Sequence, residues 1–351
     1  MQNPFTTTFS KIPSDTYIPT EQVASIIENF SYENPSESVF KITGVRGSGK
    51  TVLLAKIEKE ISEADSGWII CRLSPARDLL LQMASILAKE GLAGKKTKSH
   101  GFNISASVFG TGGGFGITEE NKEEPMDIGI AVEAMLVEAS RQGKKILVGI
   151  DEVSKNREME VFALELGKWL RAGYPVYLVC TGLYENIEQL SNVKNLTFFR
   201  RATTVQTKPL NFIRMVEMYS RKLSIPQETA KLFAATTKGY AYAFQELGVL
   251  AFKKLKTDSF DDITSELKAE LFSYAYEKIW EETTPEEKNL LLILSDDREF
   301  SRQEIMETMK NPQNYSVYRD RLLRKGLINA NRGTISLALP FFGSYMEEYC
   351  R

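Results

Sequence analysis

The feature that constrains this chain most is a glycine-rich octapeptide, residues 44–51, which reads Gly-Val-Arg-Gly-Ser-Gly-Lys-Thr. It matches the pattern G-x-x-x-x-G-K-[ST] at every fixed position. An apolar run, Val39–Ile42, precedes it, and an amphipathic stretch, Thr51–Ala64, follows it. Glycines at these places let the backbone curl so that its N–H groups point at a phosphate near the start of a helix. The segment therefore predicts a strand, a phosphate-binding loop and a helix in series.

The residue types of the octapeptide suit a nucleotide. Lys50 is predicted to reach the β- and γ-phosphates, and the hydroxyl of Thr51 to coordinate Mg²⁺. The predicted cofactors are ATP or ADP together with Mg²⁺. A glycine-rich turn that matches by accident is the alternative, but both flanks favour the phosphate loop. The loop residues predicted to bind the nucleotide are Gly44, Gly47, Ser48, Gly49, Lys50 and Thr51.

A second motif supplies acids where a nucleotide-bound metal needs them. Lys145–Ile150 is an apolar run, and Asp151 and Glu152 follow it directly. Asp151 is predicted to hold the water shell of Mg²⁺, and Glu152 to polarise the attacking water. Alternatively, the two acids only cap the next helix. Thr181 ends a further apolar run, where it either touches the γ-phosphate or the water, or caps the helix that follows.

Short apolar runs alternate with helical patterns in the first part of the chain, which is typical of an α/β fold with a parallel sheet. The predicted strands are Val39–Thr43, Trp68–Leu73, Lys145–Ile150, Val176–Thr181 and Thr203–Thr207. Residues 210–280 show only helical patterns, with breaks at Ser224–Pro226 and Lys238–Gly239. The predicted domains are an α/β core, a helical lid and a C-terminal domain, over residues 1–208, 209–283 and 284–351.

One segment, residues 99–118, interrupts this alternation. Apolar and polar residues alternate on both sides of a glycine cluster, which predicts a β-hairpin with a flexible tip; a disordered insert is the alternative. No Lys-Ser or Lys-Thr pair follows these glycines, so they do not form a second phosphate loop.

Composition excludes several classes of protein. The formal net charge of −2 excludes a uniformly basic nucleic-acid coat protein, but not a local basic patch. With a single histidine, His100, neither a histidine-based zinc site nor a Ser-His-Asp triad is expected. Cys71 and Cys180 lie in apolar runs and are predicted to be buried. No apolar run is long enough for a membrane span and the start lacks a signal-peptide pattern, so a cytoplasmic protein without membrane contact is expected.

The C-terminal domain has the pattern of a winged helix-turn-helix, with three helices followed by a hairpin. Thr284 and Ser301 are predicted N-caps, Gly326 ends the third helix, and residues 331–333 form the hairpin turn. Duplex DNA is a predicted partner through residues 314–333, with the start of the third helix in the major groove. A protein partner is the alternative, because the whole domain is nearly neutral. The side chains considered for DNA contact are Asn314, Tyr315, Ser316, Tyr318, Arg319, Arg321, Arg324 and Arg332.

Together these motifs resemble the AAA+ ATPases, and within them the origin-recognition-type initiators and related bacterial and archaeal ATPases with a C-terminal winged helix. The resemblance covers nearly the whole chain. It implies a P-loop NTPase of the AAA+/ASCE type that couples Mg²⁺-dependent ATP hydrolysis or switching to DNA binding and nucleoprotein remodelling. It also implies that Tyr17 and Ile18 lie over the adenine and that Thr181 is the sensor 1 residue. By the same resemblance, Arg200 or Arg201 reaches the γ-phosphate of a neighbouring subunit in a homo-oligomer; otherwise both are ordinary surface charges.

The lid departs from that family pattern. Residues 237–247 resemble the sensor 2 helix, but Tyr242 stands where initiators have an arginine. The same stretch resembles the glycine motif of the STAND signalling NTPases, which use nucleotide as a slow switch. The alternative expectation is therefore a STAND-like regulatory switch that acts on a protein partner with little hydrolysis.

Overall fold

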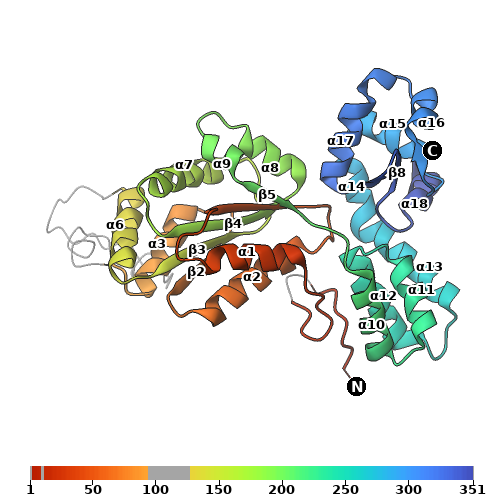
Figure 1. Cartoon of the computed structure of the whole chain (residues 1–351), viewed down its shortest axis with the longest axis horizontal. Coiled ribbons are helices and arrows are strands. Elements are labelled where there is room, and N and C mark those ends of the chain that lie inside the picture. The colour runs from red at the N-terminus through yellow and green to blue at the C-terminus, as the bar shows by residue number, and fades with distance from the viewer. Residues whose placement is uncertain (1, 9–11, 94–126, 351) are drawn as a thin grey trace, which may run out of the picture.

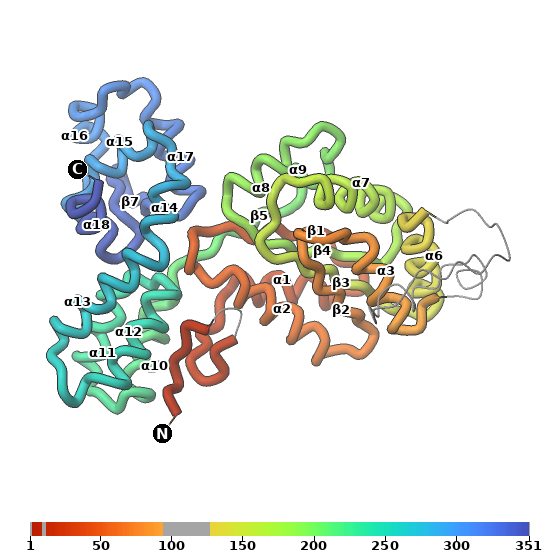
Figure 2. The backbone as a smooth tube through the Cα atoms, turned by 180° about the vertical axis from the view of Figure 1, so that it is seen from behind, coloured from red at the N-terminus to blue at the C-terminus, as the bar shows by residue number. Residues whose placement is uncertain are grey.

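A computed structural model describes residues 2–8, 12–93 and 127–350 (Figure 1). The segment 99–118, with His100 and the predicted hairpin, lies outside these residues. Two bodies are visible from both sides: an α/β core, and beside it a column that consists of helices and a small sheet (Figures 1 and 2). In the part of the chain that the structure describes, no helix has the length and apolar character that crossing a membrane requires.

Five parallel strands form the core sheet, in the spatial order β2-β3-β4-β1-β5. Their bounds are β1 Val39–Thr43, β2 Trp68–Leu73, β3 Lys145–Ile150, β4 Val176–Gly182 and β5 Thr203–Gln206. The strand predictions are thus confirmed to within one residue. The central strands β1 and β4 are buried along their whole length, as the middle of a parallel sheet requires.

Helices cover both faces of this sheet. On one face α1 (Glu21–Ser31) and α2 (Lys50–Ala64) share a hydrophobic cluster with the strands. The helices of the other face are α3 Leu79–Lys89, α6 Ile128–Arg141, α7 Arg157–Arg171, α8 Tyr184–Ser191 and α9 Thr197–Arg201. Cys71 and Cys180 are buried in this second cluster, as predicted.

The strand register places the ends of three strands side by side. Ile150 of β3 pairs with Cys180 of β4, and Thr43 of β1 pairs with Gly182 of β4. Because the strands are parallel, the loop after β1 and the acids after β3 leave the sheet at the same edge. Ligands of open α/β sheets bind at this carboxyl edge.

The lid helices, residues 210–282, begin the column beside the core. Their bounds are α10 Phe212–Leu223, α11 Gln227–Thr236, α12 Ala241–Lys254, α13 Phe260–Leu271, η1 Phe272–Tyr276 and α14 Glu277–Glu281. The two predicted breaks separate α10 from α11 and α11 from α12. The element η1 is a π-helical turn between α13 and α14, which the sequence pattern did not indicate.

The C-terminal module, residues 284–350, completes the column. Its elements are α15 Pro285–Ile293, β6 Phe300–Ser301, α16 Arg302–Thr308, η2 Pro312–Asn314, α17 Tyr315–Lys325, β7 Ile328–Asn331, β8 Thr334–Leu337 and α18 Phe342–Tyr349. Thr284 and Ser301 are the predicted N-caps, each in a capping box, and Gly326 ends α17 as predicted. The antiparallel strands β7 and β8 form the predicted hairpin, and β6 adds a third strand that sequence reasoning missed.

The lid helices and the C-terminal module share one hydrophobic core. A single cluster of buried side chains runs through both. Tyr276 of η1 packs on Phe342 and Tyr345 of α18, with ring centroids 5.0 and 6.0 Å apart, and its hydroxyl donates to the Pro340 carbonyl. The boundary predicted near residue 283 therefore falls inside one packed unit, so pulling lid and module apart would expose apolar surface.

Candidate nucleotide-binding site

The glycine-rich loop connects β1 to α2 through two left-handed backbone conformations. Gly47 has φ 72° and Gly49 has φ 89°, a region that residues with a side chain rarely adopt. A Cβ at position 47 would also lie 2.2 Å from the hydroxyl oxygen of Tyr240. The loop therefore curls at the start of α2, which is the geometry that points backbone N–H groups at an anion.

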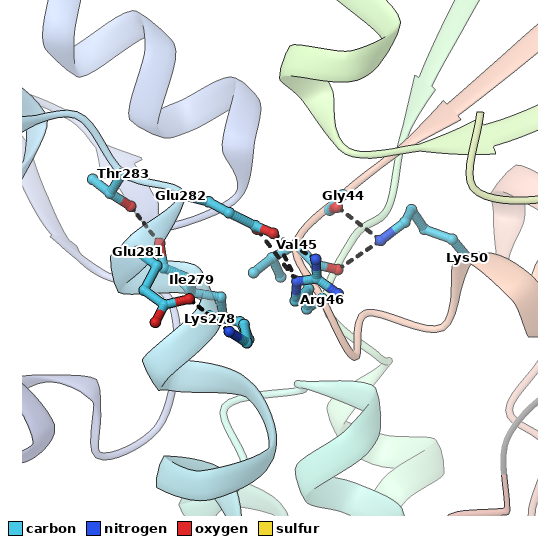
Figure 3. A network of polar contacts seen from close by, with 9 residues as sticks. All are labelled: Gly44, Val45, Arg46, Lys50, Lys278, Ile279, Glu281, Glu282 and Thr283. Atoms are coloured by element: carbon cyan, nitrogen blue, oxygen red, sulfur yellow. Dashed lines mark hydrogen bonds and ion pairs between the residues drawn. The ribbon is translucent and has the colours of Figure 1, made fainter. Parts of the chain in front are cut away.

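The ammonium group of Lys50 lies inside this curl. It donates hydrogen bonds to the carbonyl oxygens of Gly44 at 2.9 Å and Val45 at 3.0 Å (Figure 3). Burial lowers the pKa of Lys50 to about 8, while the carboxylates of Asp151 and Glu152 act in the opposite direction. A phosphate beside Lys50 would favour its charged form and offset the cost of burial.

Asp151 is the centre of a short hydrogen-bond chain. Its Oδ2 accepts from the Thr51 hydroxyl at 2.7 Å, and its Oδ1 accepts from the Thr181 hydroxyl. The Thr181 oxygen in turn accepts from the backbone N–H of Glu152 at 3.1 Å. The fold thus joins residues from α2, from the end of β3 and from β4 in one network.

The oxygens of this network suit a hard divalent cation. Thr51 offers a hydroxyl and Asp151 a carboxylate, and Mg²⁺ commonly takes only one or two ligands from the protein, with phosphates and water completing its shell. Among residues 2–8, 12–93 and 127–350, no group of three or more His, Cys, Asp or Glu side chains is arranged to hold a metal ion by itself. A magnesium ion here would depend on phosphate oxygens for much of its coordination.

Glu152 has an unusual backbone conformation, with φ 55°. A residue with a side chain adopts this left-handed region only rarely, and such conformations cluster at functional sites. The backbone N–H of Glu152 is held by its hydrogen bond to the Thr181 hydroxyl. The side chain of Glu152 is exposed and lines the pocket described next.

A pocket of about 500 Å³ opens beside the loop, a volume typical of small-molecule sites. The phosphate loop, the N-terminal residues and the first turn of α12 line it. The hydroxyl of Ser48 is buried there without a hydrogen-bond partner among the described residues. Burying an unpaired hydroxyl is costly, so the pocket fits a ligand with polar groups.

The N-terminal segment (residues 2–8 and 12–19) runs along the lid and reaches this pocket. Phe5 inserts into the hydrophobic cluster of the lid helices. Gln245 of α12 accepts hydrogen bonds from a backbone N–H and a threonine hydroxyl of the segment, both at 3.1 Å. Held in this way, the segment places Tyr17 and Ile18 against the pocket, where burial raises the pKa of Tyr17 to about 12.

The start of α12 contacts the phosphate loop directly. The Tyr240 hydroxyl donates to the Arg46 carbonyl at 2.6 Å, and the Tyr242 N–H donates to the Gly47 carbonyl at 3.0 Å. The Tyr242 ring stacks on Tyr274 of the π turn, with centroids 4.0 Å apart and planes at 14°, and both rings line the pocket. Sequence reasoning missed Tyr240 and Tyr274, because only packing brings them to the loop.

Two family models match parts of this chain. Residues 19–159, which contain the loop and Asp151, match the KAP family P-loop domain. Residues 273–346 match a model described as a domain of unknown function. No curated protein sequence matches the chain.

Solved structures resemble the chain over nearly its whole length. A Walker-type ATPase of Pyrococcus abyssi is similar with a TM-score of 0.60 and 14% identity, over 93% of this chain and 95% of that one. The ORC2 protein of Aeropyrum pernix, in its ADPNP–ADP complexes, is similar with a TM-score of 0.55 and 13% identity, over 95% of this chain and 96% of that one. The chain has the fold of an ORC-type AAA+ ATPase. The predicted α/β fold with a P-loop NTPase parallel-sheet core is therefore confirmed.

In this ORC-type fold, Arg200 and Arg201 lie outside the pocket of their own chain. They end α9, just before β5, and both are exposed. The buried Lys41 of β1 holds this turn, because its ammonium donates to the Phe199 carbonyl at 2.7 Å. The two arginines are thus displayed on the surface from an anchored helix end.

The C-terminal end of α17 contacts the ORC-type core beside the phosphate loop. Lys325 is buried between Glu287 of α15, at 2.6 Å, and Glu185 of α8. Burial alone would lower the pKa of Lys325, but its hydrogen bonds to the two carboxylates outweigh that effect, and the pKa is raised. The guanidinium of Arg324 donates to the Tyr184 hydroxyl of α8 at 3.1 Å. The C-terminal module is therefore docked on the core.

These contacts correct part of the predicted DNA face. Arg324, expected to face DNA, donates to Tyr184 of the core and pairs with Asp320 of its own helix at 2.9 Å, while its side chain stays 57% exposed. Tyr315, considered for base contacts, is buried in the shared hydrophobic core. Arg321 and Arg332 are exposed, as DNA contact would require.

Proposed function

We propose that the chain binds ATP with Mg²⁺ in this pocket and hydrolyses it slowly. The observation that carries the proposal is the chain of hydrogen bonds in which Thr51, Asp151 and Thr181 meet, close enough to Lys50 for Asp151 to influence its pKa. These are the groups that a triphosphate and its metal require together.

The residues divide the chemistry among them. Lys50 would hold the β- and γ-phosphates. Thr51 and Asp151 would hold Mg²⁺, which would supply positive charge to the phosphates when bound. Glu152 accepts the proton of the attacking water, and Thr181 orients Glu152 through its backbone. The remaining loop residues, Gly44, Gly47, Ser48 and Gly49, bind phosphate. Tyr17 and Ile18 contact the base.

Two features bear on the rate of hydrolysis. Tyr242, a neutral residue, occupies the first turn of α12 at the pocket, so this turn brings no cation to the γ-phosphate. We assign the missing positive charge to Arg200 or Arg201 of a neighbouring subunit, since both are exposed and outside their own pocket. An arginine supplied in this way accelerates phosphoryl transfer by orders of magnitude, so turnover is slow in the isolated subunit.

The output that the geometry supports best is a nucleotide-controlled switch. The C-terminal module is docked on the core at α8, next to the loop, through buried Lys325 and through Arg324. Because this contact lies beside the phosphate loop, a change of bound nucleotide can alter how the module is held on the core. DNA binding is the second candidate output, supported by the exposed Arg321 and Arg332 on the module.

A nucleotide titration tests the proposal. Lys50→Ala is expected to weaken ATP binding by at least about 100-fold, because the phosphates lose their embedded cation. The matched control is Lys59→Ala, which removes an exposed lysine from the same helix and should bind as the wild type does. ATP affinity within a few-fold of wild type in Lys50→Ala, measured by calorimetry, would refute the assignment of the loop.

A further inference from the structure

Arg46 lies at a variable position of the phosphate loop, between two compartments. It lines the nucleotide pocket and also the small cavity between the core and the C-terminal module. Its guanidinium contacts one carboxylate with two nitrogens: Nε lies 3.1 Å and Nη2 2.5 Å from Oε1 of Glu282 (Figure 3). Both side chains are partly exposed, so a ligand can reach the pair.

Glu282 stands at the junction between the lid helices and the C-terminal module. It follows α14 directly, and Pro285 begins α15 shortly after it. The junction is ordered, because the Thr283 hydroxyl donates to the Ile279 carbonyl at 2.6 Å (Figure 3). The ion pair therefore ties the phosphate loop to the point where the module begins.

The γ-phosphate of a bound triphosphate would compete with Glu282 for Arg46. Among the described residues, the cations that line the pocket are Arg46, Lys50 and Lys208. The Nζ atom of Lys208 lies 3.8 Å from Oε2 of Glu21. A guanidinium binds phosphate oxygens in the same forked geometry in which it binds a carboxylate. The charges of Arg46 and Glu282 both act on the pKa of Lys50, so the pair is within electrostatic reach of the phosphate-binding ammonium.

We propose that Arg46 distinguishes a nucleoside triphosphate from a diphosphate by exchanging Glu282 for the γ-phosphate, and so reports the nucleotide state to the C-terminal module. This rests on the proposed nucleotide binding at the loop. With a diphosphate, Arg46 keeps Glu282. With a triphosphate, Glu282 loses its partner and faces added negative charge, which loosens the junction. Lys325 and Arg324 still hold α17, so the module loosens without detaching.

The test measures the affinity ratio of a non-hydrolysable ATP analogue to ADP in Glu282→Gln. Removing the competing carboxylate frees Arg46, so the analogue should bind about two- to fivefold more tightly, the range for an exposed ion pair, and ADP should bind unchanged. The matched control is Glu266→Gln, which breaks a pair of similar exposure within the lid: 38% and 38%, against 39% and 36% for Arg46 and Glu282. Arg46→Gln should reduce the preference for the analogue.

A second readout is independent of affinity. In the wild type, hydrogen exchange of residues 282–284 and 323–327 should be faster with the analogue bound than with ADP, and Glu282→Gln should show the faster exchange with either nucleotide. Thermal unfolding checks that the variants fold.

The outcomes separate the two proposals. If the wild type binds both nucleotides but Glu282→Gln leaves their affinity ratio unchanged, or shifts it no more than Glu266→Gln does, the exchange is wrong and the nucleotide site stands. Equal strengthening of both nucleotides also overturns it, because the γ-phosphate would then play no part. If the wild type binds neither nucleotide, the proposed function itself fails, and the exchange with it.

Discussion

The phosphate loop and the C-terminal end of α17 are both short segments rich in functional residue types, yet the fold uses them differently. In the loop, left-handed glycines and two carbonyl bonds hold the Lys50 ammonium in the curl where a phosphate would bind. In α17, Lys325 is buried between two carboxylates, and the exposed Arg324 donates to Tyr184 of the core. A motif locates a site where the backbone itself fixes the geometry, whereas charge along a helix only predicts that some partner lies nearby.

The two regions also differ in what their charges meet. Asp151 binds two hydroxyls and retains capacity for a cation and its water. Lys325 is already neutralised by Glu185 and Glu287. The loop therefore fits an exchangeable ligand, and the end of α17 fits a docking contact within the chain.

The largest effect is expected on the loop side of this comparison, from Glu152→Gln. ATP binding should be retained, while hydrolysis should fall by about 10²–10⁴-fold, because an amide does not accept the proton of the attacking water. Phosphate release at saturating ATP measures it, with Glu63→Gln, an exposed acid of α2, as the control. Normal turnover in Glu152→Gln would mean that this residue has only a structural role.

On the docking side, Lys325→Ala should destabilise the protein by about 3–5 kcal/mol, because Glu287 would remain buried without its cation. Urea unfolding gives this free energy. Lys310→Ala, which removes an exposed lysine of the same module, should change stability by less than about 0.5 kcal/mol. A loss below about 1 kcal/mol for Lys325→Ala would show that water solvates Glu287 in solution.

The pKa of Lys50 gives a pH test of the loop. In the free protein this pKa is about 8, and a bound phosphate raises it, so binding takes up a proton. ATP affinity should therefore be full below that pKa and fall above it, by at most about tenfold per pH unit. Calorimetry in two buffers of different ionisation enthalpy measures the proton uptake. Lys50→Arg keeps its positive charge at every pH tested, so its ATP affinity should no longer depend on pH in this range. A wild-type ATP affinity that does not change with pH would contradict the prediction that Lys50 titrates here.

The smallest expected effect concerns the arginines of α17 and the salt dependence of DNA binding. If the module binds duplex DNA, Arg321→Ala should lower the slope of log affinity against log salt by about one, because one phosphate contact is lost. Arg324→Ala should leave the slope unchanged, since that side chain faces Tyr184. Fluorescence anisotropy across a salt series compares these neighbours on one helix. Equal losses from both variants would mean that the module undocks to bind DNA.

Sequence patterns were sufficient wherever short-range physics decides the outcome. Each core strand was predicted to within one residue, and for β1 to β4 the reason is that a strand inside a covered sheet needs an apolar run. The edge strand β5, Thr203–Gln206, is only partly buried. The caps at Thr284 and Ser301 and the end of α17 at Gly326 follow from hydrogen bonds and backbone conformations within a few residues. The proximity of Thr51 and Asp151 followed from the motifs together with the shared edge of a parallel sheet.

Tertiary packing alone decided the rest. Tyr274 reaches the pocket because a π turn rotates it toward Tyr242, and periodicity contains no sign of that turn. Lys325 pairs with Glu185 because the module docks on α8, so its charge could not be assigned to DNA or to the core in advance. Helical periodicity determines which face of a helix is buried, whereas the identity of the partner depends on how all the faces pack together, which no single segment of the sequence specifies.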